Sequence, residues 1–210
     1  MKRAQGRHGG VLIVIEGIDG SGKSTLQKKL AQRWRSLGYS VVLRREPNDR
    51  RLGLAAQRSA AHDPWTGATY FTLDRFFARA QLERSLESHD IVLMDRSFFS
   101  TLAYQGSALP RARRKLLASL QRQVTLTPDR VLLLDLPPSL ALRRIRKRRG
   151  VPAPLEQRRT LTRVARAYRR FARRRDWIVL DARKGPEELV EGVVGRSAPW
   201  LRRRVGAGRR

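Results

Sequence analysis

Gly17-Ile18-Asp19-Gly20-Ser21-Gly22-Lys23-Ser24 is the stretch of sequence that decides the fold. It matches in full the pattern of a P-loop, in which glycines let backbone N–H groups turn inward around a phosphate. The apolar run Val11 to Ile15 precedes the loop and ends at Glu16, and an amphipathic stretch follows it. A strand, a tight loop and a helix in this order are the context that a P-loop requires. We therefore predict a phosphate site at the start of the helix, where the helix dipole adds positive potential.

The residue types inside the loop have chemical reasons. Lys23 is expected to neutralise the β- and γ-phosphates of ATP, and Ser24 is expected to offer its hydroxyl to Mg²⁺. The predicted phosphate-binding set is Gly17, Gly20, Ser21, Gly22, Lys23, Ser24 and Thr25. A chance glycine-rich turn is the competing interpretation, and the strand and helix on either side argue against it.

Asp95 is the second candidate for metal chemistry. It closes the apolar run Ile91 to Met94, the position expected for a Walker-B-type carboxylate near the metal. We therefore predict Ser24 and Asp95 as the metal residues. Arg96 follows Asp95, so the second acid that would activate water in motor-type ATPases is missing there. This favours transfer of phosphate to a bound acceptor over hydrolysis.

Short apolar runs alternate with amphipathic stretches along the chain. Strands are expected at Val11–Glu16, Val41–Leu43, Ile91–Asp95, Val131–Asp135 and Trp177–Asp181. Helices are expected at Lys23–Ser36, Tyr70–Leu86, Arg113–Gln123, Leu140–Arg149, Leu161–Arg174 and Glu187–Val194, with Ser139 capping the fourth. Apolar strands separated by helices imply a parallel sheet covered on both faces. The predicted fold is α/β: a three-layer P-loop NTPase fold with a five-stranded parallel sheet flanked by helices.

Length and composition set further bounds. The 210 residues fit one kinase-sized domain, 1–210, with a short lid near 143–158 and basic tails at 1–10 and 202–210. The chain has no cysteine, which excludes disulfides, thiolate metal sites and thiol catalysis. No apolar run is long enough to cross a membrane, and the run after the basic start is too short for a secretory signal. We expect a cytoplasmic protein without membrane contacts.

The net charge of +28 is the oddest global feature. Such a surface attracts anions, so weak non-specific binding of anions or nucleic acid is an expectation. The competing interpretation is a composition bias that places arginine on solvated helix faces.

Several further motifs occur in an order that resembles the bacterial type of thymidylate kinase, from about Val11 to about Ala182. After the P-loop segment Glu16–Thr25 come Arg45-Glu46-Pro47, Phe71–Arg75, and Asp95-Arg96 followed by Ser100, Ala103, Tyr104 and Gln105. Pro128-Asp129, Asp135, Pro137 and Asp181-Ala182 complete the series. One motif alone would be weak evidence, but all of them in order are strong.

This resemblance implies a set of acceptor-binding residues. Asp19 would accept a hydrogen bond from the sugar 3′-hydroxyl, Phe71 would stack on the base, and Tyr104 would crowd the sugar 2′ position. Thr101 and Gln105 would line the base pocket. The acceptor phosphate would be clamped by the guanidinium groups of Arg75 and Arg96, joined by Arg45. Surface charge is the competing interpretation for these arginines, and an ordinary core aromatic is the competing interpretation for Phe71.

The chain departs from the family pattern at three places. Asn48–Arg51 stand where two small residues are usual, and Ser97 stands where an aromatic residue or histidine is usual. In the lid, Pro154 occupies the place of a common arginine, and the P-loop residue Gly20 is also uncharged. We expect Arg149, supported by Arg148 or Arg146, to replace the missing lid arginine.

The resemblance implies a thymidylate kinase that uses ATP and Mg²⁺ to convert dTMP to dTDP, with Lys23, Asp19, Arg96 and Arg149 as catalytic residues. It also implies a homodimer. Two alternatives remain open at this point: a related P-loop kinase with another nucleotide or nucleoside acceptor, and a basic nucleic-acid-binding P-loop protein. Aromatic residues do not alternate with the basic ones, which argues against the last.

Overall fold

The computed structural model describes residues 9–174 and 176–205, and the side chain of Arg149 lies outside this description. The strands are β1 (Val11–Glu16), β2 (Val41–Arg45), β3 (Ile91–Asp95), β4 (Arg130–Asp135) and β5 (Trp177–Asp181). They form one five-stranded sheet in the order β2-β3-β1-β4-β5, and every pairing is parallel. The predicted α/β class with a five-stranded parallel sheet is confirmed.

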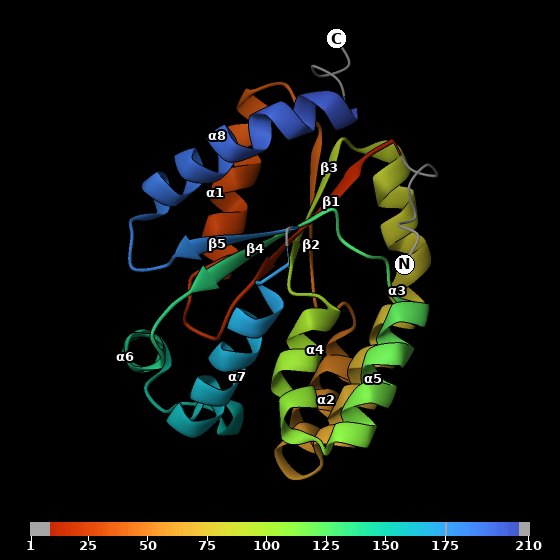
Figure 1. Ribbon diagram of the computed structural model, residues 1–210, viewed down its shortest axis with the longest axis vertical. Helices are drawn as coiled ribbons and strands as arrows, with labels where there is room; N and C mark the ends of the chain where they lie inside the picture. The colour runs from red at the N-terminus through yellow and green to blue at the C-terminus, as the bar shows by residue number, and fades with distance from the viewer. Residues whose placement is uncertain (1–8, 175, 206–210) are drawn as a thin grey trace.

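Eight α-helices lie in the described part of the chain. They are α1 (Lys23–Ser36), α2 (Arg50–His62), α3 (Pro64–Ser88), α4 (Phe98–Tyr104), α5 (Arg111–Val124), α6 (Pro138–Arg149), α7 (Arg158–Phe171) and α8 (Pro186–Val205). Two 3₁₀ turns, η1 (Gly106–Ala108) and η2 (Pro154–Glu156), follow α4 and precede α7. Figure 1 shows α1 and α8 together on one side of the strands and α4, α5 and α7 on the other.

The position of β1 explains where function gathers. It is the central strand, paired with β3 through Val11 to Ile15 and with β4 through Ile13 to Glu16. All six of its residues are buried, as expected for a parallel strand covered on both faces. In open α/β sheets ligands bind beyond the carboxyl ends of the strands, which here brings the residues after β1, β2 and β3 to one edge.

The structure corrects several predicted boundaries. The N-cap of α6 is Pro137, without a side-chain hydrogen bond, so the prediction that Ser139 caps this helix is wrong. Residues 202–205 form the last turn of α8 rather than a tail, and residues 1–8 and 206–210 lie outside the described part. The helices α2 and α4 were not predicted.

Membrane insertion has no candidate segment in the described residues: none of their helices is long and apolar enough to cross a bilayer.

Candidate active site

The P-loop adopts a backbone that favours glycine at three of its positions. Gly17 has φ +148°, Gly20 has φ +80° and Gly22 has φ +100°. A Cβ at Gly17 would lie 2.7 Å from the carbonyl oxygen of Leu134, and one at Gly20 would lie 2.6 Å from that of Ala141. The loop is therefore held tightly between β1 and the segment that leads from β4 into α6, and a side chain at either position would displace it.

Lys23 is buried at the base of this loop. Its Nζ donates to the carbonyl oxygens of Gly17 and Ile18, each at 3.0 Å. Burial and the neighbouring charge of Arg96 together lower the pKa of Lys23 to about 8, against the opposing effect of Asp19 and Asp95. The ammonium group thus lies inside the loop that would surround a phosphate.

The side chains of Ser24 and Asp95 are in contact at the carboxyl end of the sheet. The hydroxyl of Ser24 donates to Oδ2 of Asp95 at 2.7 Å, which joins the first turn of α1 to the end of β3. Oδ1 of Asp95 and Oγ of Ser21 are buried and have no hydrogen-bond partner among the described residues. This carboxylate oxygen of Asp95 and the neighbouring hydroxyl of Ser24 are both oxygen ligands, which a hard cation such as Mg²⁺ prefers.

The turn after β3 has a strained residue. Arg96 has φ +73°, a region that bulky residues rarely adopt. Its N–H donates to the carbonyl oxygen of Ile15, and Ser97 caps α4 by accepting from the N–H of Phe99. A strained backbone conformation persists only where the surrounding structure fixes it. The contacts around this turn must therefore hold Arg96 in place.

Glu16 supplies much of that support, because it is fully buried beside the turn. Its Oε1 accepts from the N–H and the hydroxyl of Ser97, and its Oε2 accepts from Ser100 and from Tyr168 of α7. Burial raises the pKa of Glu16, although these hydrogen bonds and the charge of Arg96 act to lower it. One carboxylate therefore joins the end of β1 to α4 and α7.

Asp19, Arg96 and Tyr104 form one cluster above the P-loop. Arg96 donates to Oδ1 of Asp19 and, at 3.1 Å, to the hydroxyl of Ser100. The hydroxyl of Tyr104 donates to Oδ2 of Asp19 at 2.9 Å and accepts from the Asp19 N–H at 3.0 Å. The guanidinium of Arg96 also lies 5.5 Å from the centre of the Tyr104 ring. Burial acts to lower the pKa of Arg96, but the nearby charge of Asp19 and, to a smaller extent, its other neighbours raise it well above the usual value.

A pocket of about 580 Å³ opens beside this cluster. It brings together every acceptor-binding residue expected from the sequence: Asp19, Arg45, Phe71, Arg75, Arg96, Thr101, Tyr104 and Gln105. These residues come from the P-loop, β2, α3, the end of β3 and α4, which lie far apart in the sequence. The lid residues Ala153 to Glu156 close one side of the same pocket.

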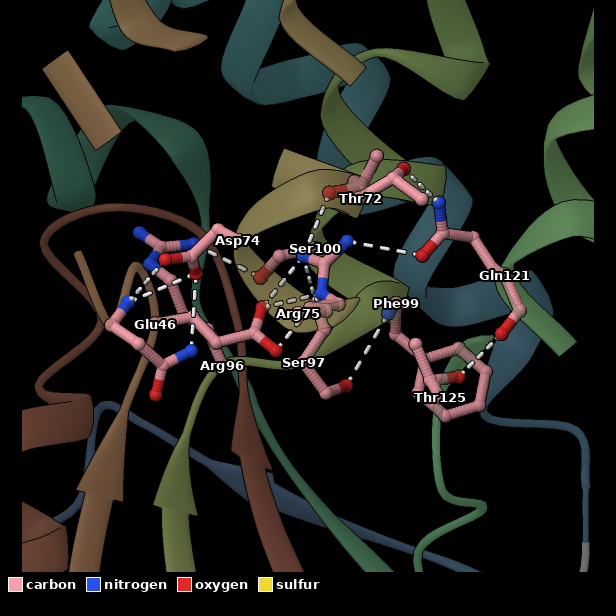
Figure 2. A network of polar contacts seen from close by, with 12 residues as sticks. Glu46, Thr72, Asp74, Arg75, Arg96, Ser97, Phe99, Ser100, Gln121 and Thr125 are labelled. Carbon is pink, nitrogen blue, oxygen red and sulfur yellow. Dashed lines mark hydrogen bonds and ion pairs between the residues drawn. The ribbon is translucent and has the colours of Figure 1, made fainter. Parts of the chain in front are cut away.

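Arg75 lies in the pocket wall as the centre of a buried polar network, shown in Figure 2. Nε and Nη2 donate to the carboxylate of Glu46, with the shortest contact at 2.6 Å. Nη1 donates to Gln121, and Nη2 also reaches the hydroxyl of Thr101 and the carbonyl oxygen of Ser97. Every nitrogen of this guanidinium is therefore engaged with protein oxygens.

Two departures from the family pattern have structural explanations. The hydroxyl of Ser97 donates to Glu16, and Ser97 is not among the residues that line the acceptor pocket. Asp49 caps α2 by accepting from the N–H groups of Arg51 and Leu52, while the N–H groups of Asn48 and Asp49 donate to Asp74. Ser97, Asn48 and Asp49 thus stabilise the segments behind the acceptor pocket and do not line it.

The lid region gives a mixed result for the expected arginine. The side chain of Arg149 lies outside the described residues, so its predicted role stays a prediction. Arg146 and Arg148 are exposed on α6, and Arg144 donates to the carbonyl oxygen of Ala182. Glu156 is buried and accepts from the N–H of Ala153 at 2.8 Å, which fixes η2.

Sequence reasoning missed one wall of the pocket. Gln57, Arg58, Ala61 and His62 of α2 line it, and no motif marks them. Glu46 was part of a motif, but no role was assigned to it. Its burial beside Arg75 could have been inferred only from their pairing in space.

Comparison with known proteins identifies relatives over most of the chain. The family model described as thymidylate kinase matches residues 15–193. A probable thymidylate kinase of Archaeoglobus fulgidus is 35% identical over 185 residues, which cover 87% of this chain and 92% of the relative. One of Sulfurisphaera tokodaii is 36% identical over 182 residues, covering 87% and 93%. A thymidylate kinase of Xanthomonas campestris pv. campestris is 40% identical over 153 residues, covering 70% and 66%.

Proposed function

Because the chain belongs to the thymidylate kinase family, we propose that it phosphorylates dTMP in the pocket beside Asp19, with ATP held by the P-loop. The product is dTDP. The observation that carries this assignment is the convergence of all eight expected acceptor residues on one pocket next to the P-loop. In such a reaction the protein contributes mainly positioning and charge neutralisation.

Lys23 binds the β- and γ-phosphates in this proposal. In the structure its ammonium donates to the carbonyl oxygens of Gly17 and Ile18, which holds it at the base of the loop. The negative charge of the phosphates is then neutralised by a buried ammonium, and electrostatic interactions are stronger in the protein interior than in water.

Arg96 and Arg45 hold the acceptor phosphate. Arg96 is fixed by the strained turn and by Asp19, and both arginines line the pocket. Arg75 has a different task here, because its guanidinium is already engaged with Glu46 and Thr101. It positions the wall against which the base lies.

Asp19 and Tyr104 read the sugar. Asp19 accepts a hydrogen bond from the 3′-hydroxyl, and the Tyr104 ring occupies the space that a 2′-hydroxyl would need. The two hydrogen bonds between these residues support the idea, because they fix the ring against the sugar site. Phe71 stacks on the base, and Thr101 and Gln105 line its edge.

The residues fit a Mg²⁺ ion. Ser24 and Asp95 would hold it, since Oδ1 of Asp95 has no donor among the described residues. No group of three or more His, Cys, Asp or Glu side chains suited to a metal occurs in the described part of the chain. This agrees with a Mg²⁺ ion that is held by few protein groups and by nucleotide phosphates. When bound, the ion neutralises charge on the β- and γ-phosphates.

The lid cation comes from the arginines near the end of α6. Arg149, supported by Arg148 or Arg146, is proposed for this role because Pro154 and Gly20 are uncharged. Arg146 and Arg148 are exposed and have no acidic partner among the described residues. An arginine at the transferred phosphate contributes on the order of 10³ or more in rate.

The functional unit is a homodimer that forms through α3 and the adjoining α5. Phe76 and Phe77 on α3 are 59% and 66% exposed, and Leu116 on α5 is 59% exposed. Large apolar side chains gathered on neighbouring helices mark an interaction surface. Figure 1 shows the two helices side by side at one edge of the molecule.

An acceptor panel tests the assignment. The protein is assayed with ATP, Mg²⁺ and each of dTMP, dUMP, dCMP, dGMP and ribothymidine monophosphate, and ADP release is recorded. We expect dTMP to give the highest kcat/KM and ribothymidine monophosphate to be disfavoured, with Tyr104→Ala reducing the sugar preference. Equal rates with the deoxy and ribo acceptors would contradict the role of Tyr104, and a better substrate than dTMP would replace the proposed acceptor.

A further inference from the structure

The outer face of α7 has a feature that the kinase reaction does not use. Seven arginines line a groove that α7 and its C-terminal extension form with Ser107 of η1: Arg158, Arg159, Arg163, Arg166, Arg169, Arg170 and Arg173. Thr162 completes the lining, and the groove has a volume of about 1000 Å³. None of these side chains lines the acceptor pocket. The groove is therefore a separate, almost purely cationic surface.

Most arginines of this groove have no acidic partner among the described residues. On the opposite side of the sheet, Lys29 and Arg33 of α1 pair with Glu187 and Glu191 of α8. Within the described residues, Arg169 is the one groove arginine with an acidic partner, Asp135. The helix α7 itself contains no Asp or Glu. The positive charge of the groove is thus left uncompensated by the protein.

The groove arginines also crowd one another. The Nε of Arg163 donates to the hydroxyl of Ser107 at 3.1 Å, which holds this side chain in the groove. Partial burial lowers the pKa of Arg163, and the charge of Arg159 lowers it further. Like charges held together without a counter-ion are stabilised when an external anion binds between them.

The shape of the groove selects an extended anion. The helix α7 runs for 14 residues from Arg158 to Phe171, which is about 21 Å at the helical rise. One strand of a nucleic-acid duplex places a phosphate about every 3.4 Å along the axis, so about six phosphates span this length. We propose that the α7 groove binds the phosphate backbone of double-stranded nucleic acid without reading its sequence.

Other polyanionic surfaces fit less well. A membrane-surface helix needs an exposed apolar face beside its basic one, but the apolar residues Leu161, Val164 and Tyr168 are buried in the core. Single-stranded nucleic acid is held by stacking on aromatic side chains, and no aromatic residue lines the groove. Arginine forks without apolar contacts are instead typical of backbone contacts to phosphate.

The test compares two triple variants of equal charge. Arg159, Arg166 and Arg170 are exposed groove residues, and all three are changed to Gln in the first variant. Arg196, Arg202 and Arg203 are exposed on α8, and they are changed to Gln in the second. Binding of a fluorescent 20-base-pair DNA duplex to each protein is measured by anisotropy between 50 and 200 mM salt, and melting temperatures confirm that both variants fold.

We expect the parent protein to bind the duplex with a slope of log K against log salt of about −5, for about six phosphates. The groove variant should reduce the slope by about 3 and weaken binding about tenfold or more at 50 mM salt, because three contacts are lost. The α8 variant should keep a slope within one unit of the parent. Equal losses in both variants would show that total charge rather than the groove is responsible, and would overturn the proposal. So would tighter binding of single-stranded DNA, of inorganic polyphosphate or of anionic phospholipid vesicles. The readout is independent of kinase activity.

Discussion

At the scale of single residues, the buried ammonium of Lys23 is the group whose charge matters most to nucleotide binding. Burial and Arg96 lower its pKa to about 8, so in the free protein Lys23 loses its proton as the pH rises through this value. An unfolded lysine titrates near 10.4, so between these values the unfolded chain binds more protons and the folded state gains stability with rising pH. Catalysis has the opposite dependence, because the phosphates need the protonated form.

The first prediction is therefore a pH profile. The kcat/KM for ATP should fall about tenfold per pH unit above pH about 8, since this ratio reports ionisations of the free enzyme. In Lys23→Arg this limb should disappear, whatever the absolute rate, because a guanidinium stays charged. Lys23→Ala should be folded and slow at every pH. A decline above pH 8 that persists in Lys23→Arg would assign the ionisation to another group.

Glu16 is the residue that holds the strained Arg96 turn. Glu16→Gln keeps the size but replaces one acceptor oxygen by an NH₂ group that faces donors, which should cost about 2–4 kcal/mol of unfolding free energy. The KM for dTMP should also rise, because Ser100 and the Arg96 turn lose their support. Tyr168→Phe removes one of the hydrogen bonds and should cost about 1 kcal/mol. Urea denaturation and steady-state kinetics measure both effects, and a Glu16→Gln protein with parental stability and KM would refute this role.

At the scale of elements, the ion pair between Arg75 and Glu46 joins α3 to the segment after β2. Both side chains are buried, so removing one partner leaves the other charged in the interior. Arg75→Met and Glu46→Leu should each destabilise the fold by about 3–5 kcal/mol. The double variant should cost clearly less than the sum of the two, because no unpaired charge remains. Additive losses in chemical denaturation would mean that the two residues do not act as a pair.

The same scale shows what sequence patterns reveal and what they miss. The P-loop was predictable because strand, loop and helix are contiguous. Eight residues of the pocket were predictable because they occur in ordered motifs, whereas those of α2 were not. The helix α2 was missed because its buried positions are Gly53, Ala56 and Ala60, which give no apolar signal. Gly53 is required by close approach, since a Cβ there would lie 2.3 Å from Pro47. In α4 nearly every residue is buried, so it has no helical period to detect.

The partnership of Arg75 with Glu46 shows a second limit. Both residues stood in motifs, but a sequence does not tell which side chain an arginine contacts. The expected phosphate clamp needs Arg75 to face a ligand, whereas its nitrogens are engaged with Glu46, Gln121 and Thr101. Only the folded structure distinguishes an arginine that binds a ligand from one that pairs with a buried carboxylate.

At the scale of the whole molecule, the exposed aromatic side chains of α3 predict an assembly. Phe76→Asp and Phe77→Asp should convert a dimer to a monomer, because they place a charge in an apolar interface. Leu37→Asp is the matched control, since Leu37 is 45% exposed at the end of α1, away from α3 and α5. Sedimentation equilibrium measures the mass of each. A parent protein that is monomeric at micromolar concentration, or a control that dissociates equally, would contradict the proposed interface.

The central claim is that a phosphoryl group passes from ATP in the P-loop to dTMP in the neighbouring pocket. It is tested most directly by following the label of [γ-³²P]ATP with the intact protein, in the presence and absence of dTMP. The account predicts that the label appears in dTDP, that little inorganic phosphate forms without dTMP, and that folded Lys23→Ala and Arg96→Ala proteins lose most of the transfer. Label that appears in inorganic phosphate regardless of dTMP, or transfer that survives both substitutions, would contradict it.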